Sequence, residues 1–243
     1  LLRVDQQNRQ IAAQLEELKQ TEAVRREFSA NVSHELKTPL MSISGYAELM
    51  MNGMVRPENI KDFSGRIYKE ANRLGNLVAD IIQLSRLDEQ QDSNVAMENV
   101  NLDELAEDVV SNLIEHARKK DIRMEYYGKS VEILGVRHVL YEMLYNIADN
   151  AVRYTNPGGH IRIYVGKKGD KPYYMVEDNG IGIPKSEQKR IFERFYRVDK
   201  SHSRQTGGTG LGLSIVKHGA MLHHAQINVD SDLGKGTKME LLF

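Results

Sequence analysis

The sequence predicts two parts of different fold class: a helical hairpin that dimerises into a four-helix bundle, followed by an α/β sandwich. Two long amphipathic stretches joined by a short turn indicate the hairpin. After a polar stretch without periodicity, helical and strand patterns mix, which indicates one sheet with helices on one face. We place a coiled-coil linker at residues 1–24, the hairpin domain at 25–90, a linker at 91–99 and the sandwich at 100–243.

Composition excludes several classes of protein. The 243 residues carry a formal net charge of -1. The chain therefore lacks the excess of basic residues that would indicate a nucleic-acid partner. The chain has no cysteine, which excludes disulfides and thiolate metal sites. No apolar run approaches the roughly 18 residues of a membrane span, and we expect no membrane contact within this fragment. Because the chain starts at Leu1 inside a helical pattern, we interpret it as a piece of a longer protein with any anchor upstream.

The first segment has the spacing of a coiled coil. Its apolar residues Val4, Ile11, Leu15 and Leu18 are separated by 7, 4 and 3 residues, which is typical of a helical seam. The helical pattern then continues to about residue 51. Pro39 lies inside it and removes one backbone hydrogen bond, so we expect the helix to bend there.

A turn at residues 52–57 leads into a second amphipathic helix. A hairpin of two such helices leaves half of its apolar stripe in water. Two copies would bury that stripe in a four-helix bundle, so we predict a homodimer. The apolar positions of the second helix are Phe63, Ile67, Ala71, Leu74, Val78, Ile81, Leu84 and Leu87.

The second part contains three predicted helices and six predicted strands. The helices are expected at residues 102–119, 136–154 and 214–222, and the strands at 123–127, 131–134, 160–166, 173–177, 226–230 and 237–243. Their order favours an α/β sandwich.

Three short runs in the second part carry polar chemistry. In residues 146–154, Asn146, Asn150 and Arg153 share one helix face. An amide oxygen is a hard ligand for Mg²⁺, and arginine suits phosphate. The other interpretation is a polar helix face that leads into the turn at residues 156–159.

The other two runs are rich in glycine. Residues 178–184 follow a strand, where Asp178 could accept a hydrogen bond from an exocyclic amine such as that of adenine, although this run is also typical of a hairpin turn. Residues 207–214 precede a helix, and backbone N–H groups there could bind phosphate. This run lacks the spacing of a P-loop or of a dinucleotide-binding motif, and a flexible hinge is its alternative interpretation.

The order of these runs, with residues 191–197 between the second and third, resembles the N, G1, F and G2 boxes of the histidine kinase ATP-binding domain. That domain has a Bergerat-type fold shared with the GHKL ATPases. By this resemblance, the polar residues between Arg197 and Gly207 would form a mobile ATP lid. The likeness extends over residues 25–243.

Residues 28–40 resemble the H box of the same family. The apolar seam points inward, which places His34 towards solvent. Unperturbed imidazole has a pKa near ~6.5, so at neutral pH one ring nitrogen of most copies has a free lone pair that can attack the γ-phosphorus of ATP in line. The resemblance implies that Glu35 stabilises the resulting cation, and that Thr38 orients water or substrate when a partner is dephosphorylated.

The resemblance also implies the nucleotide site. Arg197 matches a cation that meets the γ-phosphate, and Asn150 matches the Mg²⁺-binding asparagine. The implied ATP-binding residues are Asn146, Asn150, Arg153, Tyr154, Asp178, Gly180, Gly182, Ile183, Gly208, Gly210, Leu211, Gly212 and Leu213.

As a whole, the resemblance implies the catalytic core of a sensor histidine kinase of a two-component system. Residues 25–90 would be the dimerisation and histidine phosphotransfer domain, and residues 100–243 the catalytic ATP-binding domain. The enzyme would use ATP and Mg²⁺ and pass its phosphoryl group to an aspartate of a response regulator receiver domain, and it would also act as a phosphatase of that regulator. We expect this fragment to be cytoplasmic and the full-length protein to be anchored in the plasma membrane.

Two features depart from the family pattern. Gly135 stands where many relatives have aspartate, which would weaken a helix cap. His223 and His224 stand where many relatives have glycine. All seven histidines other than His34 match no motif, and we interpret them as surface or structural residues.

Two other functions share part of this pattern. A GHKL-type ATPase that hydrolyses ATP to drive a conformational change needs the glycine runs but not His34. A non-catalytic dimeric scaffold for response regulators needs neither nucleotide binding nor phosphoryl transfer.

Overall fold

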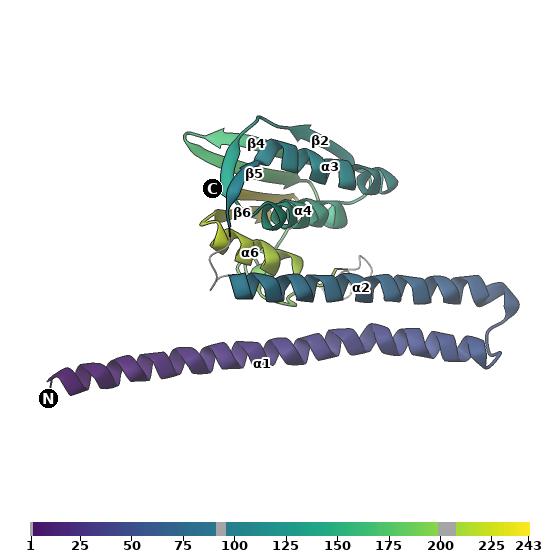
Figure 1. Cartoon of the computed structure of the whole chain (residues 1–243). Helices are drawn as coiled ribbons and strands as arrows, with labels where there is room; N and C mark the ends of the chain where they lie inside the picture. The colour runs from purple at the N-terminus through teal and green to yellow at the C-terminus, as the bar shows by residue number, and fades with distance from the viewer. Residues whose placement is uncertain (1, 91–95, 199–207) are drawn as a thin grey trace. The chain divides into compact units, whose positions relative to one another are not determined.

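The structure is a computed structural model that describes residues 2–90, 96–198 and 208–243. It divides into two compact units, Leu1–Leu77 and Val78–Phe243. The first unit is a helical hairpin and the second is an α/β sandwich, so both predicted architectures are confirmed (Figure 1). The four-helix bundle requires a second copy and stays a prediction.

The hairpin consists of α1 (Leu2–Met51), a short 3-10 turn η1 (Pro57–Asn59) and α2 (Ile60–Gln90). Helix α1 ends at Met51, and two residues later Gly53 has a left-handed φ of 67°. The N–H groups of Gly53 and Met54 donate to the carbonyls of Met50 and Leu49 at 3.2 and 3.0 Å, which satisfies two of the last carbonyls of α1. The edge-to-face contact of Tyr46 with Phe63, at 5.5 Å between ring centroids, joins the two helices beyond the turn.

Helix α1 continues through Pro39 without interruption (Figure 1). Because proline has no N–H, the Glu35 carbonyl loses its usual donor four residues on. The side chains of Val4, Ile11 and Leu18 lie outside the described residues, so the coiled-coil seam also stays a prediction.

The hairpin leaves large apolar side chains uncovered in the single chain. Leu40 is 54% exposed and Met41 63% exposed on α1, and Tyr68 is 69% exposed on α2. Leu40 belongs to the apolar stripe that the sequence assigns to a second copy, whereas Met41 and Tyr68 lie outside that pattern. Exposed side chains of this size are candidates for an interface.

The second unit is built on a five-stranded sheet of order β2-β4-β5-β7-β6. Strands β2 and β4 are parallel, and the other neighbours are antiparallel. A separate pair, β1 with β3, is antiparallel. The elements are β1 (Glu98–Asn101), α3 (Leu102–Lys119), β2 (Arg123–Tyr127), β3 (Glu132–Gly135), α4 (Arg137–Tyr154), β4 (His160–Lys168), β5 (Lys171–Asp178), η2 (Arg190–Phe192), α6 (Gly212–Leu222), β6 (Gln226–Asp232) and β7 (Gly236–Leu242).

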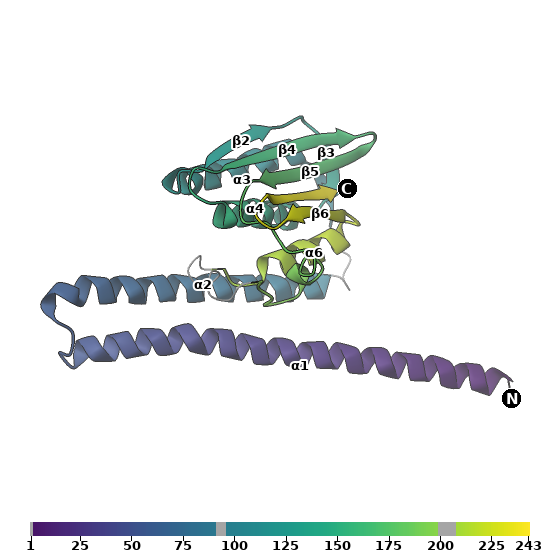
Figure 2. The same cartoon turned by 180° about the vertical axis from the view of Figure 1, so that it is seen from behind.

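Helices α3, α4 and α6 cover one face of this sheet (Figures 1 and 2). On β4, Ile161, Ile163 and Val165 are buried towards the helices while the residues between them are not. Tyr174 of β5 is fully buried, and its hydroxyl donates to the Leu144 carbonyl of α4 at 3.1 Å. The core therefore lies between the sheet and the three helices.

The structure differs from the predicted elements at the linker. Helix α2 continues to Gln90, and β1 begins at Glu98, inside the predicted linker 91–99. Residues 91–95 of that linker lie outside the described residues. The sequence missed β1 because its four residues, Glu98–Asn101, contain one buried apolar side chain and no alternation.

The end of α6 explains one unusual residue. His224 has a left-handed φ of 52° immediately after the helix. The N–H groups of His224 and Ala225 donate to the carbonyls of Met221 and Ala220 at 3.3 and 2.8 Å, the hydrogen-bond pattern that usually has glycine in the left-handed place. A non-glycine residue in this conformation is strained.

We therefore expect His224→Gly to stabilise the protein. Removing Cβ relieves roughly 1–2 kcal/mol of strain, and the extra freedom of unfolded glycine returns about 0.5–1 kcal/mol of that gain. Urea unfolding should show a net increase of up to about 1.5 kcal/mol in the free energy of unfolding. His224→Ala is the control: it keeps Cβ and should bring no comparable gain. An equal change in the free energy of unfolding in His224→Gly and His224→Ala would show that the His224 backbone is not strained.

Candidate functional site

Helix α4 carries two asparagines one turn apart. The Asn146 amide nitrogen donates to the Glu142 carbonyl at 2.9 Å, which turns its oxygen towards the start of α6. A Cβ at Gly212, the first residue of α6, would lie 2.5 Å from that oxygen. Asn150 is half-buried, and no described residue hydrogen-bonds to its side-chain amide. Asn150 therefore keeps a hard oxygen donor available for a cation.

The end of α4 is held by charged groups. Arg153, expected at the phosphates, forms an ion pair with Asp149 one turn earlier. The Lys120 ammonium donates to the carbonyls of Val152 and Arg153 at 2.8 and 2.9 Å. Burial, and then the nearby Arg153, lower the pKa of Lys120. The sequence analysis missed Lys120, because no local pattern relates a lysine at the end of α3 to carbonyls more than 30 residues away.

Asp178 lies at the end of β5 and organises the loop that follows. Its Oδ1 accepts hydrogen bonds from the backbone N–H groups of Gly180 at 2.8 Å and Thr237 at 3.3 Å. Burial raises the pKa of Asp178, and these two bonds oppose that rise. Among the described residues none donates to Oδ2, so this oxygen remains an acceptor that a ligand amine could use.

Two glycines let this loop approach its neighbours. A Cβ at Gly180 would lie 2.4 Å from the Tyr154 carbonyl at the end of α4, and the Ile181 N–H donates to that carbonyl at 3.1 Å. Gly182 has a φ of 70°, and a Cβ there would lie 2.0 Å from the Asp232 carbonyl. The predicted residues Tyr154, Gly180 and Gly182 are therefore brought together by backbone contacts.

The same loop is fixed by a serine that the sequence analysis did not identify. The Ile183 N–H donates to Ser231 Oγ at 2.8 Å, and Ser231 Oγ donates to the Gly236 carbonyl at 2.8 Å. Ser231 is 4% exposed. This buried hydroxyl links residues 178–184 to the β6–β7 hairpin, and β5 pairs with β7, so this run is not the turn of a β-hairpin.

The second glycine-rich run contacts the predicted F box. The Phe195 N–H donates to the Gly210 carbonyl at 2.9 Å, and Arg197 Nη2 donates to the Thr209 carbonyl at 2.8 Å. Gly210 has a φ of 77°, and Leu211 is fully buried. Gly208 and Leu213 are half-buried in the same run. Residues 199–207, which include Gly207 and most of the predicted lid, lie outside the described residues.

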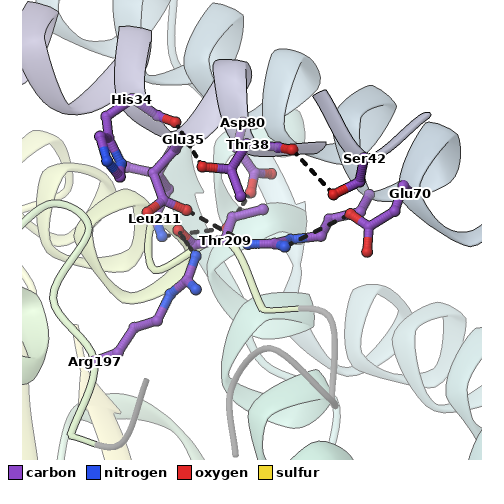
Figure 3. Close-up of polar contacts among 10 residues, drawn as sticks. His34, Glu35, Thr38, Ser42, Glu70, Asp80, Arg197, Thr209 and Leu211 are labelled. Carbon is purple, nitrogen blue, oxygen red and sulfur yellow. Dashed lines mark hydrogen bonds and ion pairs between the residues drawn. The ribbon is translucent and has the colours of Figure 1, made fainter. Parts of the chain in front are cut away.

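Thr209 connects this run to the last part of α2. Its hydroxyl donates to Asp80 Oδ2 at 2.6 Å and accepts from the Leu211 N–H at 3.2 Å (Figure 3). Burial raises the pKa of Asp80, while the hydrogen bond from Thr209 lowers it. This contact spans 129 residues, and no signal in the sequence indicates it.

In the first unit, the His34 side chain is exposed to solvent, as the sequence predicts. The Thr38 hydroxyl donates to the His34 carbonyl at 3.1 Å, and the Ser42 hydroxyl donates to the Thr38 carbonyl at 3.2 Å (Figure 3). Thr38 is exposed and one turn from His34. While its hydrogen is donated to the His34 carbonyl, the Thr38 hydroxyl can still accept a hydrogen bond from a ligand or a water molecule.

Glu35 is held by an arginine that the sequence analysis missed. Arg73 of α2 lies 3.5 Å from the Glu35 carboxylate and 3.7 Å from that of Glu70, and its side chain is 13% exposed. A half-buried carboxylate next to imidazole can stabilise a ring cation. Here its charge is shared with Arg73, which also fixes its position.

The described residues contain neither a cluster of three metal-binding side chains nor a helix able to cross a membrane.

The chain matches two protein families. Residues 24–90 match the His Kinase A (phospho-acceptor) domain, and residues 135–243 match the histidine kinase-, DNA gyrase B- and HSP90-like ATPase. The sensor-like histidine kinase SenX3 of Mycobacterium tuberculosis is 39% identical over 221 residues, which cover 90% of this chain and 54% of SenX3. The sensor histidine kinase WalK of Bacillus subtilis is 36% identical over 224 residues, which cover 88% of this chain and 35% of WalK. The chain thus spans about half or less of these relatives.

Solved structures agree on the fold. The histidine kinase ThkA, in complex with the response regulator protein TrrA, aligns with a TM-score of 0.72 at 23% identity, covering 93% of this chain and 63% of ThkA. Full-length ShkA, in complex with AMPPNP, aligns with a TM-score of 0.62 at 26% identity, covering 89% of this chain and 45% of ShkA.

We expect Gly212→Ala to weaken binding of Mg-ADP about tenfold. The new Cβ would displace the Asn146 amide and break its hydrogen bond to Glu142, a loss of roughly 1–1.5 kcal/mol. Isothermal titration calorimetry measures the change. The control is Gly65→Ala, because nothing lies within 4 Å of a Cβ there. Unchanged affinity in Gly212→Ala would mean that Asn146 does not serve the site.

Proposed function

Since this chain belongs to the histidine kinase family, with a phospho-acceptor domain ahead of an ATP-binding domain, we propose that it phosphorylates its own His34 from ATP and passes the phosphoryl group to an aspartate of a response regulator. The family that the sequence resembles is thereby confirmed. The observation that carries the proposal for His34 is its exposed ring, one turn from Thr38 and next to the Glu35 carboxylate.

The ATP-binding domain offers groups suited to the adenine and the phosphates of the nucleotide and to Mg²⁺. Asp178 Oδ2 accepts a hydrogen bond from the exocyclic amine of adenine. Gly180 and Gly182 let the loop after Asp178 pack closely against the carbonyls of Tyr154 and Asp232. The first N–H groups of α6, at Gly212 and Leu213, face anionic oxygens of the phosphates. The amide oxygen of Asn150 would hold Mg²⁺, which offsets phosphate charge when bound.

The transfer step uses the neutral imidazole of His34. A ring nitrogen attacks the γ-phosphorus, a P–N bond forms, and the bond to the β,γ-bridging oxygen breaks as ADP leaves. The ring becomes cationic, and the Glu35 carboxylate stabilises that charge and accepts the proton from the other nitrogen. Arg73 holds the carboxylate in place through their 3.5 Å ion pair. The phosphoryl group then passes from His34 to the receiver aspartate.

The exposed apolar side chains of the hairpin support the proposed homodimer, because a second copy would cover them. We infer that this part of the protein acts in the cytoplasm, because the proposed reaction uses ATP. The curated relatives are named sensor kinases and are longer than this chain, and a membrane anchor and sensory region would belong to the rest of such a protein.

Transfer from radiolabelled ATP tests the proposal. Wild-type protein should acquire an acid-labile label, and His34→Gln should acquire none while still binding Mg-ADP, because it lacks only the attacking nitrogen. Asp178→Asn should lose label for a different reason, since an amide donor facing the adenine amine weakens binding roughly 10-fold or more. Asp230→Asn, on an exposed carboxylate of β6, is its control. Equal label on wild type and His34→Gln would refute His34 as the acceptor, and label appearing only as free phosphate would favour a simple ATPase.

Thr38→Ala should reduce dephosphorylation of the response regulator about tenfold and autophosphorylation much less, because the hydroxyl orients the attacking water but does not touch the attacking imidazole. Ser42→Ala is a matched control, since it removes a hydroxyl with the same backbone hydrogen bond one turn along. Both rates are measured with a purified phosphorylated receiver domain. A parallel loss of both activities in Thr38→Ala would make Thr38 a structural residue beside Pro39.

A further inference from the structure

Helix α4 begins without a cap from its own sequence. Its N-cap residue, Val136, has no side chain that can accept a hydrogen bond. The Val136 N–H instead donates to Nε2 of His223 at 2.9 Å, across 87 residues of sequence. His223 stands at the end of α6, and its Nδ1 lies 2.7 Å from the Gly219 carbonyl. One imidazole therefore joins the end of α6 to the start of α4.

These two contacts require one protonation state of the ring. Nε2 accepts from an N–H and so carries no proton, while Nδ1 donates to a carbonyl and so carries one. The neutral Nδ1–H tautomer satisfies both partners. A protonated ring would place a second donor against the Val136 N–H and break that contact.

Gly135 provides the space for the imidazole. A Cβ at Gly135 would lie 2.7 Å from Cδ2 and 2.8 Å from Nε2 of His223. Any side chain there would displace the ring or push the start of α4 away. The two departures noted in the sequence, Gly135 and His223, thus form one contact.

The two helices joined by His223 also build the nucleotide site at their other ends. A Cβ at Gly219 would lie 2.5 Å from Met143 Sδ, and a Cβ at Gly212 would lie 2.5 Å from Asn146 Oδ1. Helix α6 therefore runs antiparallel to α4 at close range. Val136 and Asn146 are about ten residues apart, which is about 15 Å along the helix. A shift at the His223 end moves Asn146, and Asn150 one turn further, relative to the glycine run.

We propose that His223 is a positioning residue for the nucleotide site, and that its neutral imidazole holds α4 in the binding arrangement, so that nucleotide affinity falls when the ring is protonated. This inference rests on the proposed ATP-binding function of the domain. His223 touches no nucleotide in this scheme and acts through the α4–α6 pair.

The surroundings favour the neutral ring. Burial, followed by the charges of His138 on α4 and His224 beyond α6, lowers the pKa of His223, while the hydrogen bond to Gly219 opposes this. On the adjacent β1–β3 pair, Glu98 lies opposite Gly135 in the register and is exposed. Because the folded pKa lies below the ordinary value of ~6.5, the His223 contact is fully present above that pH and is lost as pH falls through the folded pKa.

Calorimetric titration with Mg-ADP at pH 7.5 and pH 5.5 tests the proposal in four proteins. In wild type, the affinity for Mg-ADP should be lower at pH 5.5 than at pH 7.5. Part of this fall comes from titration of the nucleotide itself. In His223→Gln, the amide oxygen can accept from Val136 at either pH, so the fall should be about tenfold smaller. In His223→Ala, affinity should be about tenfold weaker already at pH 7.5. His116→Gln, which removes an exposed imidazole from α3, should follow wild type.

Two results would overturn the proposal: the same pH response in His223→Gln as in wild type, or wild-type affinity at pH 7.5 in His223→Ala. If His223→Ala does not fold, as judged by circular dichroism, the comparison of His223→Gln with wild type still decides. Failure of the proposed function is distinguishable, because then wild type itself would bind no Mg-ADP at pH 7.5.

Discussion

The nucleotide-binding half of this protein depends on the close antiparallel packing of α4 against α6. Two glycines of α6 make it possible, since a Cβ at Gly219 would lie 2.5 Å from Met143 Sδ and a Cβ at Gly212 would lie 2.5 Å from Asn146 Oδ1. Interhelical distance is set by the side chains at the contact, so a larger residue at either glycine would displace these side chains of α4. Helix α4 carries the candidate cation ligand and α6 begins at the candidate phosphate loop. The distance between α4 and α6 therefore sets the distance between the candidate cation ligand and the candidate phosphate loop.

Helix α4 is held at both ends by side chains from other elements. His223 accepts from its first N–H group, and Lys120 donates to carbonyls in its last turn. A helix with four unsatisfied groups at each end needs such partners when its ends are buried. Both partners come from other elements of the domain. The position of α4, and with it that of Asn150, therefore depends on how those elements pack against it.

Reactivity in the hairpin depends on a different constraint. In the proposed transfer, the ring of His34 must be exposed to meet a nucleotide, while its neighbour Glu35 must be positioned to stabilise a cation. The 3.5 Å ion pair with Arg73 meets the second need by fixing the carboxylate from the opposite helix. The position of Glu35 therefore depends on how the two helices of the hairpin are packed.

The sequence by itself determined the hairpin, the α/β sandwich, most of the helices and strands and the exposure of His34, because these follow from periodicities of a few residues that are local in the chain. It also identified Gly135 and His223 as separate departures from the family pattern. Only the tertiary structure brought those two residues together, paired Arg73 with Glu35 and placed Lys120 at the end of α4. Such contacts join residues tens of positions apart, and no local preference encodes them. They arise where buried polar groups find partners once the elements have packed.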